Sequence, residues 1–290
     1  MTPVVSAILV NFNAGPELRR ALQSIADELQ NVEWDAVVVD NASSDGSAEI
    51  ALEFKPQTTL LRNLDNVGFA RGVNMGLSAT TAPLVLIMNP DCRLMAGAVA
   101  TLRTELDANP SCVIAAPKIL NPDGSLQGSA RGDPDMLTGL FGRTGSGTRL
   151  LPWLSLSRRN VVTDDAVRSG ASSVVVDWVS GACMFARREA FVGVHGFDER
   201  YFLYWEDADL CRRLRARGLH TRYVPGAVAI HRVGHSSRAS QVLATKAFHD
   251  SAYLYYATHV ASHRLDPKRP LAGLLLGARR WWMTRRLAES

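Results

Sequence analysis

The sequence predicts an α/β fold with a mostly parallel central sheet flanked by helices and a C-terminal helical extension. Three observations lead to this prediction. Short apolar runs alternate with segments of helical periodicity in the first half of the chain, several of these runs end at Asn or Asp, and the pattern from residue 239 onward is helical. Alternating strands and helices imply parallel strands joined by right-handed crossovers.

The expected elements of the first half are short strands and amphipathic helices in alternation. The run 85–88 is apolar on both faces and lies between Pro83 and Pro90, which is typical of a central parallel strand. Over 15–29, leucine and isoleucine recur at helical spacing. The full set comprises strands at 4–11, 36–40, 58–62, 84–88 and 113–116 and helices at 15–29, 47–54, 68–77 and 94–106.

The second half is less regular. Residues 121–173 are rich in Gly, Ser, Arg and Asp, and a long segment without periodicity predicts a functional loop, with Trp153 as an anchor. Beyond it we expect strands at 174–179, 183–186, 221–224 and 227–231 and helices at 206–217, 240–263 and 270–287.

Composition limits the classes of function. The chain has 290 residues, of which 47% are hydrophobic and 21% charged, and a net charge of +4, so it is not expected to bind nucleic acid. Its four cysteines form no C-x-x-C pair, which argues against a zinc or dithiol site and favours reduced cysteines in the cytoplasm. No leader and no apolar run of about 20 residues is present, so a cytoplasmic protein is expected.

Two carboxylates follow expected strands directly. Asp91 comes after the strand at 84–88, and Asp40 ends the strand at 36–40. Ligands of open α/β sheets bind beyond the carboxyl ends of strands, so both acids lie where a ligand or metal would be. The alternatives are ordinary ones: Asp91 capping the next helix, and Asp40 within an Asx turn.

The segment 66–76 has three glycines at helix-compatible spacing. Each costs about 0.5–1 kcal/mol relative to alanine within a helix, which is tolerated where the backbone must approach a ligand. Arg71 can meet a phosphate, and Asn74 lies one turn along the same face. Close packing of the helix on the sheet would explain the glycines but not Arg71.

Three acids crowd the first turn of the helix at 206–217. Acids are favoured at a helix N-terminus, and Asp209 can also pair with Arg213 four residues on. Glu206 and Asp207 have no such partner, so they are candidates for general-base catalysis. Two aromatic residues precede them, Tyr204 and Trp205.

His231 ends the strand expected at 227–231. A lone histidine is more often structural than a ligand. Together with Asp91 it would supply an Asp/His pair for Mg²⁺ or Mn²⁺, completed by substrate phosphate oxygens and water. Nothing in the sequence shows that the two residues converge.

These segments, in this order, resemble the family 2 glycosyltransferases of the GT-A fold. The resemblance covers residues 4–236 and rests on the segments 4–13, 39–47, 66–76, 89–91 and 206–210 and on His231. The variants Val-Asp-Asn-Ala-Ser-Ser-Asp-Gly and Asn-Pro-Asp look most like bacterial rhamnosyltransferases. At the metal motif, Asn89 replaces the first acid of Asp-x-Asp, which puts metal dependence in question.

The resemblance implies a role for each candidate residue. For nucleotide-sugar binding these are Asn11, Asp40, Asn41, Arg71, Asn74, Asn89 and Asp91. The metal, Mg²⁺ or Mn²⁺, would be held by Asp91 and His231. Asp207 is the implied catalytic base with Glu206 as its support, and Tyr204 and Trp205 are assigned to the acceptor.

The implied reaction is a single displacement with inversion, in which Asp207 takes the proton of the acceptor hydroxyl. The donor would be a nucleotide sugar, dTDP-L-rhamnose, and the acceptor a saccharide or polyprenyl-diphosphate saccharide used for cell-wall or surface polysaccharide. UDP- or GDP-sugars are the alternative donors. The implied domains are a transferase at 1–238, with a nucleotide-sugar half at 1–118 and an acceptor half at 119–238, and an extension at 239–290.

Two other classes of protein are alternatives to a glycosyltransferase. An NAD-dependent oxidoreductase needs G-x-G-x-x-G after the first strand, where this chain has Asn11-Phe12-Asn13-Ala14-Gly15-Pro16. A non-catalytic module that binds nucleotide sugar or polyprenyl lipid would leave the acidic pair at 206–207 unexplained.

The C-terminal segment 264–290 mixes arginines with paired tryptophans. That composition suits a helix on an anionic membrane surface, here the inner face of the plasma membrane. It equally suits a helix packed on the protein body or on a second subunit in a homodimer.

Overall fold

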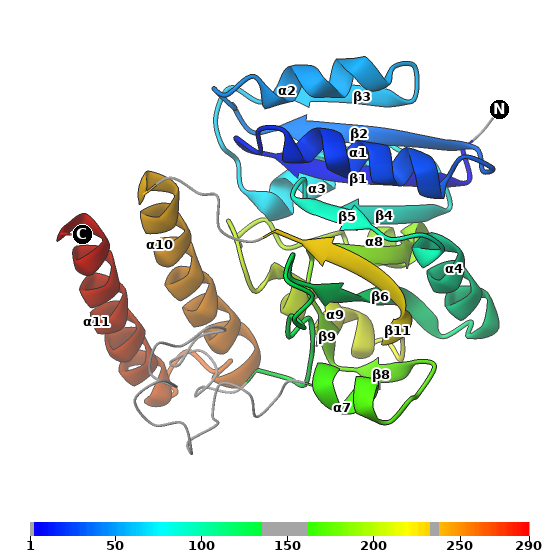
Figure 1. The fold of residues 1–290 in the computed structure, drawn as a ribbon. Helices are drawn as coiled ribbons and strands as arrows, with labels where there is room; N and C mark the ends of the chain where they lie inside the picture. Colours follow the sequence, from blue (N-terminus) through cyan, green and yellow to red (C-terminus); the bar gives the residue numbers. More distant parts are fainter. Residues whose placement is uncertain (1–2, 135–161, 233–237, 290) are drawn as a thin grey trace.

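The computed structural model describes residues 3–134, 162–232 and 238–289. Trp153 and most of the loop expected at 121–173 lie outside the described residues. Within them, one large mixed sheet runs through the molecule, and a pair of long helices stands beside it (Figure 1).

The first half of the sheet is parallel, as predicted. Its strands are β1 (Val5–Asn11), β2 (Trp34–Asp40), β3 (Thr58–Arg62) and β4 (Leu84–Met88), in the order β3-β2-β1-β4. Between them run α1 (Glu17–Glu28), α2 (Ser47–Ile50), a 3₁₀ turn (Ala51–Phe54) and α3 (Phe69–Ser78). The predicted bounds agree to within about two residues because each strand is a buried apolar run.

The second half of the sheet is mixed. β10 (Cys183–Arg187) runs antiparallel between β4 and β6 (Cys112–Leu120), and β11 (His220–His231) is parallel to β6. Two short strands pair antiparallel with β11, namely β5 (Cys92–Leu94) and β8 (Val174–Val176), while β7 (Ala130–Arg131) and β9 (Trp178–Val179) form a separate small sheet. The helices of this half are α4 (Ala98–Ala108), α7 (Thr163–Arg168), α8 (Arg188–Gly193) and α9 (Glu206–Arg215).

Several expected boundaries were wrong. The strand expected at 113–116 extends to Leu120 as β6, and the strand expected at 174–179 is divided between β8 and β9. The helix expected from residue 94 begins at Ala98, because residues 92–94 form β5, which is too short to show a period of its own. The two strands expected at 221–224 and 227–231 are one strand, β11, with a register shift between Val224 and Val228.

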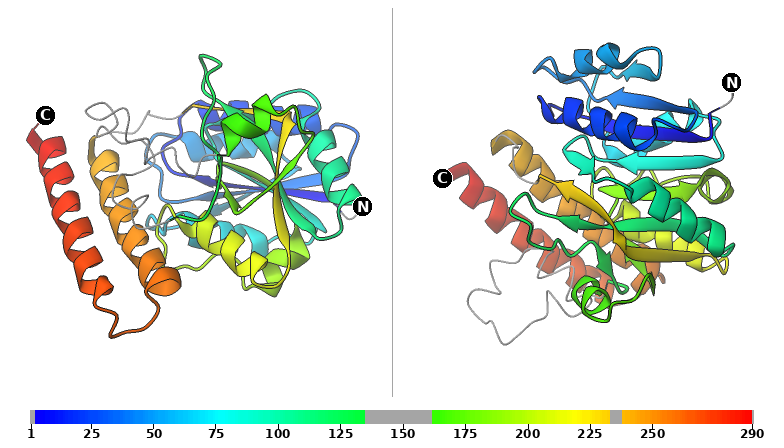
Figure 2. Two further views of the ribbon diagram at one scale, coloured as in Figure 1. Left: turned by 90° about the horizontal axis from the view of Figure 1, so that it is seen from below. Right: turned by 45° about the vertical axis from the view of Figure 1, so that its right-hand side comes forward.

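Helices cover both faces of the sheet (Figure 2). Alternate residues of the strands point to opposite faces: Leu9 and Leu86 pack with α1 and α4, whereas Ile8 and Ile87 pack with α3 and α9. The β1–β4 strands therefore share a rigid, doubly covered core, and all four end at the same rim.

The C-terminal extension is a helical pair. α10 (Arg238–Tyr255) continues through a π-helical turn (Tyr256–Val260), and α11 (Lys268–Glu289) returns alongside it. α10 lies between α11 and the sheet domain in both views (Figures 1 and 2). None of the helices described is long and apolar enough to cross a membrane.

Candidate functional site

The carboxyl rim of the parallel strands carries a buried polar cluster. Asn11, at the end of β1, donates from Nδ2 to Asp40 Oδ1 over 2.7 Å and to Ser47 Oγ over 2.8 Å. The other Asp40 oxygen accepts the backbone N–H of Ser43 at 3.1 Å. Asp40 thus shapes the loop that follows β2, as the Asx-turn alternative expected, and it does so at the rim where the resemblance expects a nucleotide.

Asn41 links this loop to the segment before α3. Its side chain donates to Asn66 Oδ1 and to the carbonyl of Gly68, and it accepts from Asn63. Gly68 has φ +86°, and a Cβ there would lie 2.4 Å from the carbonyl oxygen of Phe202. Glycine is needed at this position for close backbone approach, which brings the 202–207 segment to the rim.

Arg71 and Asn74 lie on α3 facing the loop before α9. The Arg71 side chain is 59% exposed and lies 3.9 Å from Glu199. Asn74 donates from its amide to the carbonyl of Phe197 and accepts the N–H of the same residue, each over 2.9 Å. Asn74 therefore clasps the 197–199 loop, whereas Arg71 stays accessible to a ligand, and nucleotide binding by either remains a prediction.

The structure brings Asp91, Asn89 and His231 together. His231 Nε2 lies 3.1 Å from Asp91 Oδ1 and 3.3 Å from the Asn89 side-chain amide. The pairing of β5 with β11 causes this convergence, because it sets His231 opposite Cys92. Asp91 is not a helix cap, since the N-cap of α4 is Gly97.

Gln127, which the sequence did not point out, fixes the orientation of His231. Its Nε2 donates to the carbonyl oxygen of His231 over 2.8 Å, so its Oε1 is the atom that faces His231 Nδ1 at 3.0 Å. Nδ1 therefore donates to Gln127, and Nε2 is the ring nitrogen directed toward Asp91. Asn121 holds Gln127 in turn by accepting from the same Nε2 over 2.7 Å.

The Asp91–His231 pair fits a divalent cation. Adjacent ligands of an octahedral ion with bonds of about 2.1 Å lie about 3 Å apart. The measured separation is 3.1 Å. In the described part of the chain no group of three His, Cys, Asp or Glu forms a complete metal site, so diphosphate oxygens and water would supply the other ligands.

Replacing Gln127 with Met should weaken Mn²⁺ binding by about 10–100-fold, because residues that orient a ligating histidine usually contribute that much. Electron paramagnetic resonance of Mn²⁺, in the presence of a nucleoside diphosphate, measures the affinity of the protein for the ion. Gln23→Met, on α1 with an exposed hydrogen bond to Asp27, is the matched control. A Gln127→Met titration that overlays the wild type would show that the contact is only structural.

The acids of α9 differ in their partners. Asp209 accepts from Arg213 over 2.7 Å, as the spacing predicted, and lies 2.6 Å from His259 Nε2. Asp207 receives the backbone N–H of Gly181 at one oxygen and that of Ala208 at the other. Gly181 directly precedes Ala182, whose carbonyl accepts the N–H of Asn89, so Asp207 is directed toward the Asp91 end of the rim.

Glu206 and Asp207 are both buried, with 4% and 3% of their surface exposed. The turn before them is unusual: Tyr204 and Trp205 both have positive φ, 68° and 71°, a region that bulky residues rarely adopt. Such backbone clusters at functional sites when the surroundings hold it in place. Here the fold fixes the start of α9 in one orientation.

α10 supplies the surroundings of this turn. Trp205 is 7% exposed and packs on Phe248 and Tyr255, and Tyr204 also contacts Phe248. The helical extension is therefore part of the support of the candidate base. The acceptor role of the two aromatic residues remains a prediction, and the burial of Trp205 favours Tyr204 of the two.

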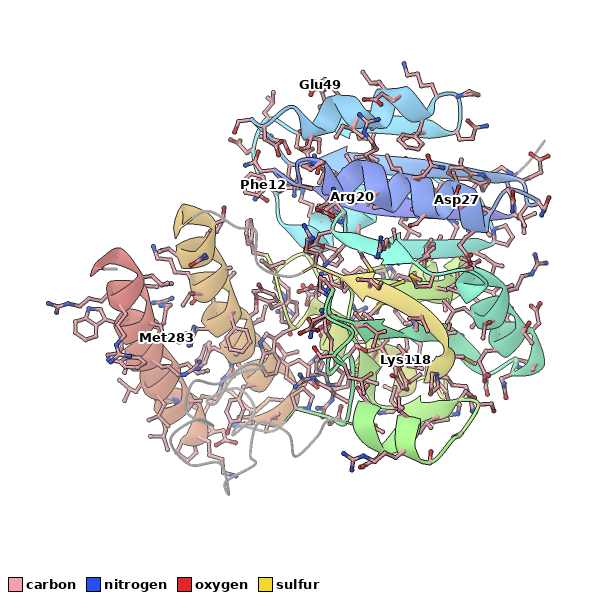
Figure 3. All side chains as sticks on the ribbon, in the orientation of Figure 1. Phe12, Arg20, Asp27, Glu49, Lys118 and Met283 are labelled. Carbon is pink, nitrogen blue, oxygen red and sulfur yellow. The ribbon has the colours of Figure 1, made fainter. Side chains whose placement is uncertain are left out.

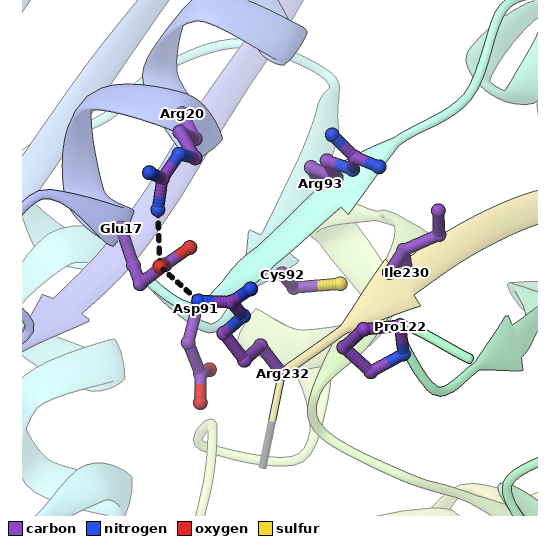
Figure 4. A pocket seen from close by; sticks show the side chains of 8 residues that line it. All are labelled: Glu17, Arg20, Asp91, Cys92, Arg93, Pro122, Ile230 and Arg232. Atoms are coloured by element: carbon purple, nitrogen blue, oxygen red, sulfur yellow. Dashed lines mark hydrogen bonds and ion pairs between the residues drawn. The ribbon is translucent and has the colours of Figure 1, made fainter. Parts of the chain in front are cut away.

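A pocket of about 210 Å³ opens beside Asp91, on the side of α1 (Figure 4). Glu17 is one of the residues that line it, and ion pairs join Glu17 to Arg20 and Arg232. Phe12, which follows β1, lies at the rim that faces α10 (Figure 3). The surroundings of Asp91 are thus open and rich in arginine, as a site for a diphosphate requires.

Of the four cysteines, Cys92 is among the residues that line the pocket beside Asp91. All four are free and buried. Burial raises the pKa of Cys112 and that of Cys211, each to about 11, so neither thiol is a nucleophile near neutral pH.

Comparisons with known proteins agree with this geometry. The family model described as glycosyl transferase family 2 matches residues 6–163, and one described as glycosyl transferase family group 2 matches residues 133–248. An N-acetylglucosaminyl-diphospho-decaprenol L-rhamnosyltransferase of Mycobacterium tuberculosis is 32% identical over 269 residues, which cover 89% of this chain and 85% of the relative. The rhamnosyltransferase WbbL of Escherichia coli is 48% identical over 68 residues, covering 23% of this chain and 26% of the relative.

Solved structures share the fold. A mannosyltransferase from Pyrobaculum calidifontis, in complex with GDP-Man and Mn²⁺, has a TM-score of 0.60 at 18% identity and covers all of this chain and 74% of its own. GalNAc-T7 with UDP, GalNAc and Mn²⁺ has a TM-score of 0.64 at 15% identity, covering 91% of this chain and 52% of its own. The chain is a glycosyltransferase with the GT-A fold, and it belongs to glycosyl transferase family 2.

Proposed function

We propose that the chain transfers L-rhamnose from dTDP-L-rhamnose to a hydroxyl of a saccharide carried on polyprenyl diphosphate. The observation that carries this proposal is the 32% identity to the mycobacterial rhamnosyltransferase over nearly the whole chain. The buried cluster of Asn11 and Asp40 and the Asp91–His231 pair, all at one rim, support a nucleotide-diphosphate donor there.

Each end of the rim has its own part in the proposed reaction. Asp40 binds the base, and Arg71 lies within reach of the diphosphate. Asp207, oriented by two backbone N–H groups, takes the proton of the acceptor hydroxyl as that oxygen attacks the anomeric carbon. Glu206 supports it from the same turn. The attack proceeds on the face opposite the diphosphate and inverts the anomeric centre.

Asp91 and His231 would hold the Mg²⁺ or Mn²⁺. When bound, the ion offsets the negative charge that develops on the departing diphosphate. Asn89 stands where an acid is usual, and its amide lies 3.3 Å from His231 Nε2. Asn89 thus helps to orient the histidine, and one carboxylate rather than two faces the ion. With Asp91 and His231 as its protein ligands, the metal site is expected to have moderate affinity and to be filled together with the nucleotide.

A donor-hydrolysis screen tests the proposal. The full-length protein with Mn²⁺ is incubated with dTDP-L-rhamnose and, separately, with UDP- and GDP-sugars, and nucleotide release is measured. The expected result is release that is fastest with dTDP-L-rhamnose. Faster release from GDP-mannose or UDP-GalNAc would instead assign a donor of the kind bound in the two structural neighbours.

The acceptor class also implies a place of action. A polyprenyl-diphosphate acceptor is held in a membrane, so the proposal includes peripheral contact through residues 264–290 at the inner face of the plasma membrane. Homodimerisation and the separate tasks of 1–118 and 119–238 remain predictions.

A further inference from the structure

The outer face of α11 is apolar, and its apolar residues are exposed in the part of the chain that the structure describes. Six residues spaced three or four apart form it, and all are exposed: Leu271, Leu274, Leu275, Ala278, Trp281 and Trp282. The exposed fractions reach 73% at Leu274 and 61% at Trp281. That spacing places them in a single stripe along about three turns of the helix.

The opposite face of α11 already has a partner. Ala272 and Leu276 are buried, and Arg279 donates to His249 of α10 over 2.9 Å. Arg280 forms an ion pair with Asp250 of the same helix. In both views α11 is the outermost element, with Met283 far from the sheet (Figures 1–3). Among residues 3–134, 162–232 and 238–289, the protein body therefore covers one side of this helix.

Positive charge is concentrated in the same segment. Residues 264–290 contain seven Lys or Arg and two Asp or Glu, a net charge of +5, against +4 for the whole chain. The preceding 263 residues are thus close to neutral, at −1. At the far end of the stripe the guanidinium groups of Arg285 and Arg286 lie 5.4 Å and 4.0 Å from the ring centres of Trp281 and Trp282.

A second copy of the chain is a poor partner for this face. Lys268 and Arg269 precede the stripe, and Arg285 and Arg286 follow it. Two such faces would bring basic residues together whether the helices paired parallel or antiparallel, and like charges in contact are unfavourable. An anionic surface, by contrast, complements both ends.

We propose that the outer face of α11 docks on a membrane surface that contains anionic lipids. The leucines and tryptophans enter the boundary between headgroups and acyl chains, and the flanking cations contact lipid phosphates. α10 packs on α11 and also on Trp205, and His259 of the π-helical turn that follows α10 pairs with Asp209. Because these contacts join α11 to the catalytic turn, docking holds the candidate site next to the membrane. Only this last consequence rests on the proposed function.

Co-sedimentation of the full-length protein with vesicles tests the proposal. Vesicles of phosphatidylcholine alone are compared with vesicles of equal parts phosphatidylcholine and phosphatidylglycerol, without donor or acceptor. We expect binding to the anionic vesicles that falls with added salt. Leu274→Asp should weaken binding by about tenfold or more, and the pair Arg285→Gln and Arg286→Gln by a similar factor.

Leu64→Asp is the matched control, because Leu64 is 96% exposed and belongs to the donor half rather than to the helical pair. It should bind vesicles like the wild type. Thermal melts of all variants check folding, which an exposed position should not disturb. Equal vesicle binding by the wild type and Leu274→Asp would overturn the proposal. A dimer in light scattering that Leu274→Asp dissociates would also overturn it, and would assign the face to a second copy.

The outcome is separate from that of the donor screen. Vesicle binding needs no sugar donor, so a wrong donor assignment leaves this result intact. Conversely, a protein that does not bind vesicles can still hydrolyse dTDP-L-rhamnose.

Discussion

Asp207→Asn should lower the rate of sugar transfer by about 100- to 10,000-fold while leaving nucleotide binding within about twofold of the wild type. The loss is the usual contribution of a positioned general base, since the amide keeps the shape of the carboxylate but cannot take a proton. Asp207 lies in the first turn of α9, where its two oxygens accept the backbone N–H groups of Gly181 and Ala208. Asparagine can keep only one of these hydrogen bonds, so thermal melts check that the variant is folded. Single-turnover transfer and calorimetric titration with dTDP measure the two quantities.

Asp209→Asn is the control for this variant, because it makes the same change two residues away. Asp209 is 1% exposed and pairs with Arg213 and His259, so its loss should lower the melting temperature. Transfer by the folded fraction should persist. If Asp207→Asn transferred sugar at a rate close to that of the wild type, Asp207 would not be the base.

Asp91→Asn should lower kcat/KM by roughly 100-fold or more and abolish most of the gain in activity on adding Mn²⁺. The Asp91 carboxylate is 31% exposed, lies 3.1 Å from His231 Nε2, and is the one acid of the Asn89–Asp91 segment. Removing it takes away the only anionic protein ligand proposed for the ion, whose stabilisation of the diphosphate contributes several kcal/mol. Steady-state kinetics over a range of Mn²⁺ concentrations measures the effect.

Asp107→Asn serves as the control here. Asp107 is an exposed residue of α4 in a weak ion pair with Arg103, and surface pairs of this kind contribute little. The control should keep the wild-type dependence on Mn²⁺. Should Asp91→Asn keep it as well, the ion would have to bind elsewhere or play no part.

Local pattern was sufficient for the parallel half of the sheet. The apolar runs of β1, β2 and β4 each end at a polar residue, and parallel strands end at a common rim, so Asn11, Asp40 and Asp91 could be placed together in advance. The pairing of Asp209 with Arg213 likewise follows from helical spacing alone.

Contacts between residues far apart in the chain could not be predicted from local sequence pattern. Asp91 and His231 meet only because the three residues of β5 pair with the end of β11, and so short a strand shows no period. Gln127 reaches His231 from a loop 104 positions away in the chain. Asn74, expected near the nucleotide, is engaged by Phe197 instead, a contact that no spacing rule suggests.

The same limit applied to the C-terminal segment. The mixture of arginine and tryptophan was compatible with packing on the body, on a second subunit or on a membrane, and in the structure the two faces of α11 differ in burial. Ala272 and Leu276 face α10, whereas Leu274 and Trp281 are exposed. Which face is buried depends on the approach of α10, which is set by its packing on Trp205 and Asp209.

The central claim is a single displacement in which Asp207 directs the acceptor hydroxyl against the anomeric carbon while Asp91 and His231 hold the diphosphate end. The anomeric configuration of the product, determined by nuclear magnetic resonance from the one-bond C1–H1 coupling, tests it most directly. The account predicts a glycoside inverted relative to the donor sugar. A product that retains the donor configuration would contradict it, because one attack from the Asp207 side cannot yield retention.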